Sequence, residues 1–112
     1  MNRSKILENR DDLIEGTFIY ELHELRRFNK KLYFELIDGI NDYLSAEQVA
    51  GRKPDQEMLS FLSWFVMGVM NSVIAHNNAN DCYVIEDFDM SSWCEDYEGK
   101  LESLLNRIVA LV

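Results

Sequence analysis

Proline, glycine and cysteine are scarce in this sequence, and their scarcity limits what the chain can be. With one proline and five scattered glycines, the chain has no low-complexity tract or linker that would divide its 112 residues. Domains most often have about 100–150 residues, so we expect a single domain over residues 1–112. The hydrophobic share of 47% is that of an ordinary globular protein, which excludes extensive disorder.

The two cysteines, Cys82 and Cys94, are too few for the disulfide framework of a small secreted domain. We expect them to pack as small apolar side chains. The basic start at Arg3 and Lys5 leads into acidic residues with no apolar stretch, so the sequence predicts no secretory signal. We therefore expect a cytoplasmic protein.

Patterns that would indicate catalysis or metal binding are also missing. The glycines form no phosphate-binding loop, and no Glu-x-x-His pair points to a di-metal carboxylate site. The spacing of His76, Cys82 and Cys94 matches no standard zinc site, and His23 has no nucleophile pattern beside it. The acids of residues 81–89 do not alternate as in a calcium-binding EF-hand loop. We expect a protein that is not an enzyme and needs no metal or cofactor.

Apolar residues recur at helical spacing in the first half of the chain. A short helix is predicted over residues 4–15, ending at Gly16. A longer one is predicted from Thr17 to Gly51, with an apolar stripe from Phe18 to Leu44 and possible breaks at Asn29 and Gly39.

Two further helices are predicted in the second half. Asp55 is a suitable N-cap for a helix that ends near His76, and Ser92 with Glu95 fits a capping box for the last helix. Residues 82–85 favour extended structure, but no second strand pattern exists to pair with them, so we predict a loop. The expected fold is an all-α bundle of about four helices with an acidic loop before the last one.

The stretch from Met58 to Ala75 has no charged residue over eighteen positions, which is the threshold for a candidate membrane span. Asn71, Gly68 and three serines interrupt it, and no basic residue follows within twenty positions to anchor an orientation. We therefore favour a helix buried on all sides within a bundle, with a membrane span as the alternative.

Basic residues are the other scarce group, and they are scarce in one half of the chain. Residues 1–53 carry nine basic and ten acidic side chains, whereas residues 54–112 carry two basic and ten acidic ones, for a total of −9. This balance argues against nucleic acid and anionic membranes as partners. The basic run Arg26–Lys31 is flanked by acids within one helical turn, which favours pairing within a helix over RNA binding.

Seven acids and no basic residue lie between Asp81 and Glu98, interleaved with aromatic residues. Carboxylates would steer a cationic partner into contact and aromatic side chains would hold it, so the segment predicts a protein-binding site. The other interpretation is a solvated loop and helix start, in which acids stabilise the helix dipole. The predicted contact residues are Tyr83, Glu86, Asp87, Phe88, Asp89, Trp93, Glu95, Asp96, Tyr97 and Glu98.

In size, charge and helical pattern, the chain resembles the small acidic immunity proteins of bacterial toxin systems. Examples are those paired with nuclease colicins or with contact-dependent growth inhibition toxins. The resemblance implies a non-catalytic inhibitor that occludes the active site of a basic toxin domain, most commonly a nuclease. The alternative is a helical homo-oligomer or adaptor that uses surplus apolar surface on the stripe of residues 18–44.

Overall fold

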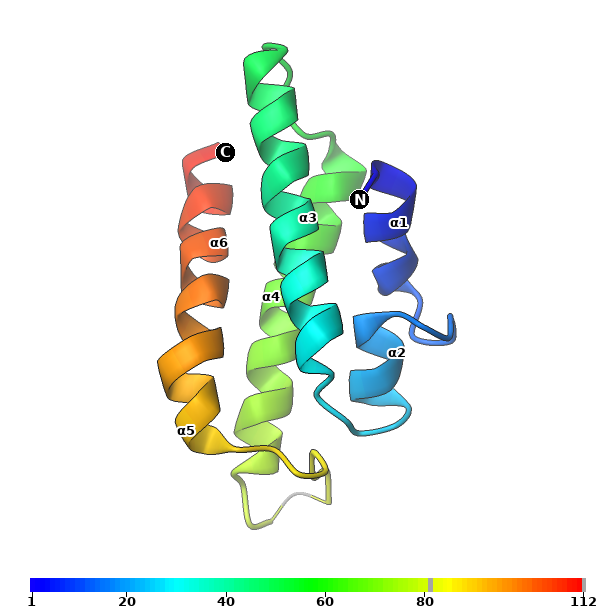
Figure 1. Ribbon diagram of the computed structural model, residues 1–112, viewed down its shortest axis with the longest axis vertical. Helices are drawn as coiled ribbons and strands as arrows, with labels where there is room; N and C mark the ends of the chain where they lie inside the picture. The colour runs from blue at the N-terminus through cyan, green and yellow to red at the C-terminus, as the bar shows by residue number, and fades with distance from the viewer. Residues whose placement is uncertain (81, 112) are drawn as a thin grey trace.

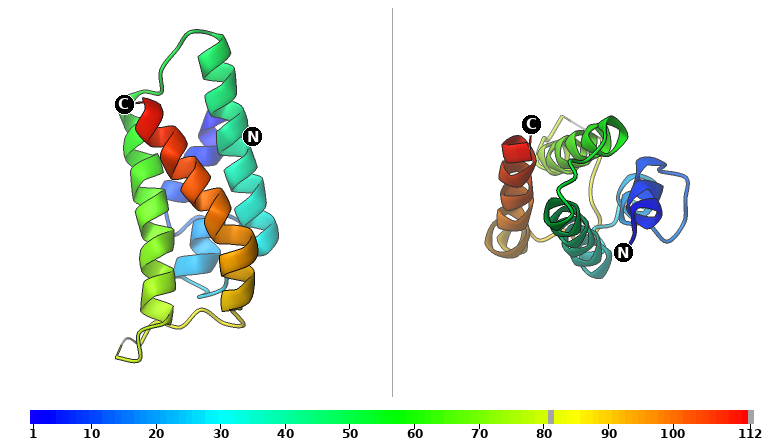
Figure 2. Two further views of the ribbon diagram at one scale, coloured as in Figure 1. Left: turned by 90° about the vertical axis from the view of Figure 1, so that its left-hand side faces the viewer. Right: turned by 90° about the horizontal axis from the view of Figure 1, so that it is seen from above.

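The computed structural model describes residues 1–80 and 82–111, and these residues form an all-α bundle as predicted (Figure 1). Three long helices, α3, α4 and α6, run along the length of the molecule (Figure 2). The short helices α1 and α2 lie on one side of α3 and α4, and α6 lies on the other. The elements are α1 (Arg3–Leu7), the 3₁₀ turn η1 (Glu8–Arg10), α2 (Phe18–His23), α3 (Lys30–Val49), α4 (Gln56–His76), α5 (Met90–Ser92), the π-helical turn η2 (Trp93–Tyr97) and α6 (Glu98–Leu111).

The helix predicted from Thr17 to Gly51 is divided at Asn29, which is one of the two possible breaks, and the chain turns back between α2 and α3. Thr17 caps α2 as expected, but Asn29 begins a new helix by accepting a hydrogen bond from the Leu32 N–H at 3.1 Å. Arg26 adopts a left-handed backbone with φ of 53° at the turn. A continuous helix over residues 18–49 would span about 48 Å, against about 31 Å for α4. Folding it back lets both halves of the stripe be buried.

The predicted helix over residues 4–15 is also shorter than expected. It ends at Leu7 and passes through η1 into an irregular turn. The buried side chain of Asn9 stabilises that turn, because its amide donates to the Ile6 carbonyl at 3.3 Å and accepts from the Ile19 N–H at 3.3 Å. One polar side chain thus satisfies a backbone carbonyl before the turn and a backbone N–H after it. In a continued helix, backbone groups would satisfy one another and this side chain would not be needed.

The second half of the chain follows the prediction more closely. Asp55 caps α4 by accepting from the Met58 N–H at 2.9 Å, and α4 ends at His76. Residues 82–85 form an extended loop, as expected. The last helical segment begins at Met90, because Asp89 caps it through the Ser91 N–H, and Ser92 caps nothing. The capping box predicted at Ser92 is therefore wrong by three residues.

The expectation that α4 is buried on all sides is wrong. Phe61, Phe65 and Val69 lie in the core, but four large apolar side chains of α4 are 39–64% exposed. Within the described residues, α4 is the one helix whose length and composition would allow it to cross a membrane, and 44% of its apolar window is buried in the fold. The exposed apolar residues are Trp64, Met67, Met70 and Ile74.

Aromatic rings fill the centre of the bundle where α2, α3, α4 and η2 meet. Phe28, from the turn before α3, stacks on Tyr97 with ring centroids 5.1 Å apart. Phe18 lies edge-on to Phe28 at 5.2 Å and to Phe65 at 6.2 Å. Tyr33 is fully buried, and its hydroxyl donates to the Tyr97 carbonyl at 2.7 Å, which joins α3 to the π-helical turn. Such ring pairs contribute about 0.5–1.5 kcal/mol each beyond area burial.

We predict that Tyr33→Phe lowers the free energy of unfolding by about 1 kcal/mol, because the buried Tyr97 carbonyl loses its donor. Burial raises the pKa of Tyr33 above its ordinary value of 10.0. The unfolded chain therefore ionises first, and wild-type stability should fall as pH rises above 10. Urea titrations at pH 7 and at pH 10.5 measure both effects. Tyr20→Phe, at a half-buried tyrosine, is the control, and an equal loss in both variants would contradict the prediction.

Candidate interaction surface

Hydrogen bonds between uncharged groups help to hold the acidic segment between α4 and α6 against the bundle. The Ile85 N–H donates to Nδ1 of His76 at 2.9 Å, and the Tyr83 hydroxyl donates to the Leu22 carbonyl at 2.6 Å. The Glu86 N–H donates to the Arg26 carbonyl at 2.7 Å, which forms a single β-bridge between Arg27 and Glu86. Backbone and uncharged side chains make these contacts, so the carboxylates are free to point outward.

The carboxylates of this segment are exposed and lack basic partners. Glu86, Asp87, Glu95 and Asp96 are all exposed, and none forms an ion pair among the described residues. Asp81, which the sequence analysis grouped with them, lies outside the described residues. The unpaired acids therefore lie on the loop before α5 and on η2, at one end of the molecule (Figure 1).

Both basic residues of the second half point away from the acidic segment. Lys100 lies 3.9 Å from Asp38 of α3 and over the ring of Phe34. The Arg107 guanidinium donates to the Asn41 carbonyl and side chain and to Ser45, all on α3. The two positive charges of α6 are thus used to join it to α3, and the acids on the rest of its surface stay uncompensated.

Two of the predicted acidic contact residues also have structural roles. Asp89 accepts from the Ser91 N–H at 3.0 Å and the Ser92 hydroxyl at 2.9 Å, and these bonds hold the pKa of its carboxyl below the usual range. Glu98 accepts from the Trp93 indole N–H at 2.9 Å, and its backbone N–H donates to the Trp93 carbonyl across the wide π-helical turn. The π turn therefore fixes the position of the Glu98 carboxylate.

The prediction that aromatic residues of this segment lie on the surface is wrong for two of four. Trp93 is 2% exposed and Tyr97 is 8% exposed, because both pack on Phe28 in the core. Phe88 is half-buried between His76 and Trp93. Tyr83 is half-buried, and the Arg26 guanidinium lies 5.7 Å from its ring centroid. The carboxylates thus form a surface, and Trp93 and Tyr97 form the support beneath it.

The sequence predicted that the basic run Arg26–Lys31 lies on one helix, but the run spans the turn between α2 and α3 and the start of α3. Lys31 pairs with Glu35 one turn along α3 at 4.0 Å, which is the expected pairing within a helix. Arg27, in the turn, pairs with Glu21 of α2 at 3.5 Å. Arg26 instead donates to the Cys82 carbonyl at 3.4 Å. The turn between α2 and α3 thus places one positive charge beside the acidic loop.

The cysteines and histidines do not come together as a metal site. Cys82 and Cys94 are both free and exposed, so their predicted role as buried apolar side chains is wrong. Across the part of the chain that the structure describes, no group of three or more His, Cys, Asp or Glu side chains could hold a metal ion. His23 is half-buried, 3.8 Å from Asp12 and edge-on to Trp64.

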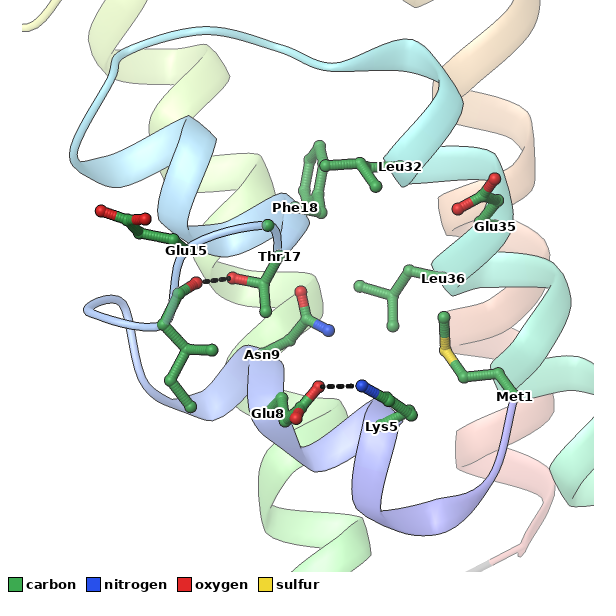
Figure 3. A pocket seen from close by; sticks show the side chains of 12 residues that line it. Met1, Lys5, Glu8, Asn9, Glu15, Thr17, Phe18, Leu32, Glu35 and Leu36 are labelled. Carbon is green, nitrogen blue, oxygen red and sulfur yellow. Dashed lines mark hydrogen bonds and ion pairs between the residues drawn. The ribbon is translucent and has the colours of Figure 1, made fainter.

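A pocket of about 320 Å³ lies between α1, η1, the turn before α2 and α3 (Figure 3). Several of the polar groups that line it already have partners. Lys5 pairs with Glu8 at 3.6 Å, the Thr17 hydroxyl donates to the Ile14 carbonyl at 2.8 Å, and Asn9 bonds to backbone groups. Nothing in the pocket is arranged for chemistry on a bound molecule.

Sequence reasoning missed an apolar groove that runs between α4 and α6, next to the acidic segment. The signal was present in the sequence. Apolar residues cover every side of residues 58–75, whereas a helix at the edge of a small bundle can bury only one side. The surplus side chains had to remain exposed or meet a partner.

Comparisons with known proteins found no matching family model, curated protein or solved structure.

We predict that His76→Phe undocks the acidic loop, because the ring still fills the space beside Phe88 but no longer accepts the Ile85 N–H. Leaving a buried donor unsatisfied costs about 1–3 kcal/mol. Hydrogen exchange of the Ile85 amide should therefore become at least about tenfold faster. His76→Asn is the matched control, because its side-chain oxygen can replace Nδ1, and it should restore slow exchange. Slow exchange in His76→Phe would refute this role.

Proposed function

We propose that this chain is a non-catalytic inhibitor of the immunity-protein kind, acting in the cytoplasm. Its acidic end would bind a basic toxin domain of the nuclease class and occlude the active site of that domain. The observation that carries the proposal is the group of exposed carboxylates, Glu86, Asp87, Glu95 and Asp96, that no basic side chain of the described residues neutralises.

The free energy of such a surface favours a cationic partner. Neighbouring carboxylates repel one another, and the fold gains nothing from the repulsion, since Ser, Asn or Lys at these positions would remove it. A partner rich in Lys and Arg would convert the repulsion into attraction. It would also associate about 10–10³ times faster than a neutral one at low salt. Nucleases carry basic surfaces because their substrates are polyanions.

The contact residues of the proposed site differ from those expected from the sequence. Glu86, Asp87, Glu95 and Asp96 would make the ion pairs, with Asp89 and Glu98 contributing charge while they hold α5 and the π turn. Tyr83 and Phe88 are half-buried and can supply partial apolar contact. Trp93 and Tyr97 are not proposed as contacts, because they lie in the core.

The alternative of a homo-oligomer built on the apolar stripe of residues 18–44 loses its basis. Leu22, Leu36 and Ile40 are at most 1% exposed, since the fold-back of α2 onto α3 covers them within the chain. Exposed apolar surface exists on α4 and α6 instead, and its use is a separate question addressed below.

The test uses the protein encoded by the reading frame next to this one, where toxin and immunity genes are expected as a pair. We predict that expressing that protein alone kills the host cell and that co-expressing this chain restores growth.

With the purified pair, Glu95→Lys combined with Asp96→Lys should slow association at least tenfold at about 50 mM salt and reduce its salt dependence. Both positions are exposed, and neither forms an ion pair among the described residues.

The matched control is Glu15→Lys with Asp42→Lys, which changes the net charge equally at exposed positions outside the acidic segment. It should leave the association rate within about twofold of wild type. Equal slowing in both double variants would mean that only total charge matters. Failure of the chain to protect cells from its neighbour would refute inhibition.

A further inference from the structure

Two adjoining hollows form a continuous groove between α4 and α6, and both are lined by Met70 and Glu98. Their volumes are about 250 and 510 Å³. The groove exists because α6 crosses α4 obliquely. Figure 2 (left) shows this oblique crossing. The other apolar residues that line it include Val66, Leu101 and Leu105 in the smaller hollow and Val73, Ile74 and Met90 in the larger.

The apolar lining is left open to solvent. Met70 is 39% exposed, Leu105 is 42% exposed and Ile74 is 62% exposed, and Met67 on the neighbouring side of α4 is 64% exposed. Covering apolar surface is worth about 25 cal/mol per Å², so a partner that fits the groove gains free energy from it. Methionine side chains are flexible and adapt to irregular shapes, so they can pack against the side chains of a binding partner.

The charge around the groove has one sign. Glu98 lines both hollows and Glu102 lines one, and neither hollow is lined by a Lys or Arg. The indole N–H of Trp93 fixes the Glu98 carboxylate, and the exposed Glu95 and Asp96 precede it in the π turn. An occupant therefore needs an apolar face for the floor and positive charge beside it for the rim.

We propose that this groove binds an amphipathic α-helix of the partner, with its apolar face on Met70, Ile74 and Leu105 and Lys or Arg side chains on Glu98 and Glu102. The lining along α4 and its C-cap runs from Val66 to Asn77, which is about 16 Å or three helical turns. That length suits a docked helix of about eleven residues. The inference rests on the proposed function, since it names the segment of the basic partner that the inhibitor contacts.

A second copy of this chain fits the groove less well. Its α4 carries no Lys or Arg, and the two basic residues of its α6 are directed to α3. Two chains of net charge −9 would bring like charges together at the acidic rim without compensation. Complementary charge thus favours a basic helix from a different protein.

The probe is a synthetic helical peptide of about eighteen residues with leucines on one face and lysines on both flanks. Its twin has glutamate in place of every lysine. Titration calorimetry at about 50 and 500 mM salt measures binding to the full chain. We expect the lysine peptide to bind, with an affinity that falls as salt rises, and the glutamate peptide not to bind.

Two variants locate the peptide. Met70→Lys should weaken binding at least tenfold, whereas Val49→Lys, at a position 90% exposed on α3, should leave it unchanged. Glu98→Gln with Glu102→Gln should weaken binding about tenfold at low salt and little at high salt. Glutamine at position 98 keeps an oxygen for the Trp93 N–H, so the fold is preserved, which circular dichroism checks.

Several results would overturn the inference. Equal binding of both peptides would do so, and so would unchanged binding by Met70→Lys. A wild-type dimer in sedimentation-velocity experiments that Met70→Lys converts to a monomer would show that a second copy occupies the groove. Capture of the chain by phosphatidylcholine vesicles in place of the peptide would show that it binds lipid. The outcomes separate this inference from the proposed function. If the chain protects cells and Met70→Lys protects equally, the inhibitor function stands and the groove is not its contact. If the peptide binds as predicted but the chain protects against nothing, the groove stands and the inhibitor function falls.

Discussion

The packing of aromatic rings around Phe28, at the turn between α2 and α3, is the interaction on which the rest of this structure depends. Its half-buried ring contacts Phe18 and Tyr33 from the first half of the chain and Phe88, Trp93 and Tyr97 from the second. It therefore joins the two ends of the chain: the folded-back N-terminal half and the segment that leads into α6. Rings packed on this one residue help to position the π turn and the start of α6, and hydrogen bonds to His76, Leu22 and Arg26 hold the loop before them.

The acidic surface follows from that packing. Because apolar and backbone contacts hold the segment, its carboxylates are not needed for folding, apart from the capping by Asp89 and the Trp93–Glu98 hydrogen bond. The positive charges of α6 serve the contact with α3. Negative charge therefore accumulates at one end of the bundle without compensation, and that separation of charge gives the surface its preference for a cationic protein.

The apolar surface of α4 has a different origin. A helix that is apolar on every side needs neighbours on every side, and the bundle supplies them on one side through α2 and the core and only partly through α6. The oblique crossing of α6 leaves a groove bordered by Glu98 and Glu102. Apolar and acidic surfaces thus adjoin, so a single amphipathic basic element can satisfy both.

The sequence by itself determined the helical class, the bounds of α4, the extended loop after it and the uneven charge, because periodicity, capping residues and charge are local properties. It offered Asn29 and Gly39 as possible breaks in the long helix but could not decide between them, since the apolar stripe continues through both and only the length available in the bundle decides where the chain folds back. It also could not tell that Phe88 is half-buried while Trp93 and Tyr97 are buried in the core. The sequence around an aromatic residue is the same whether its ring faces a partner or the core, and only the tertiary packing on Phe28 decided which way each ring faces.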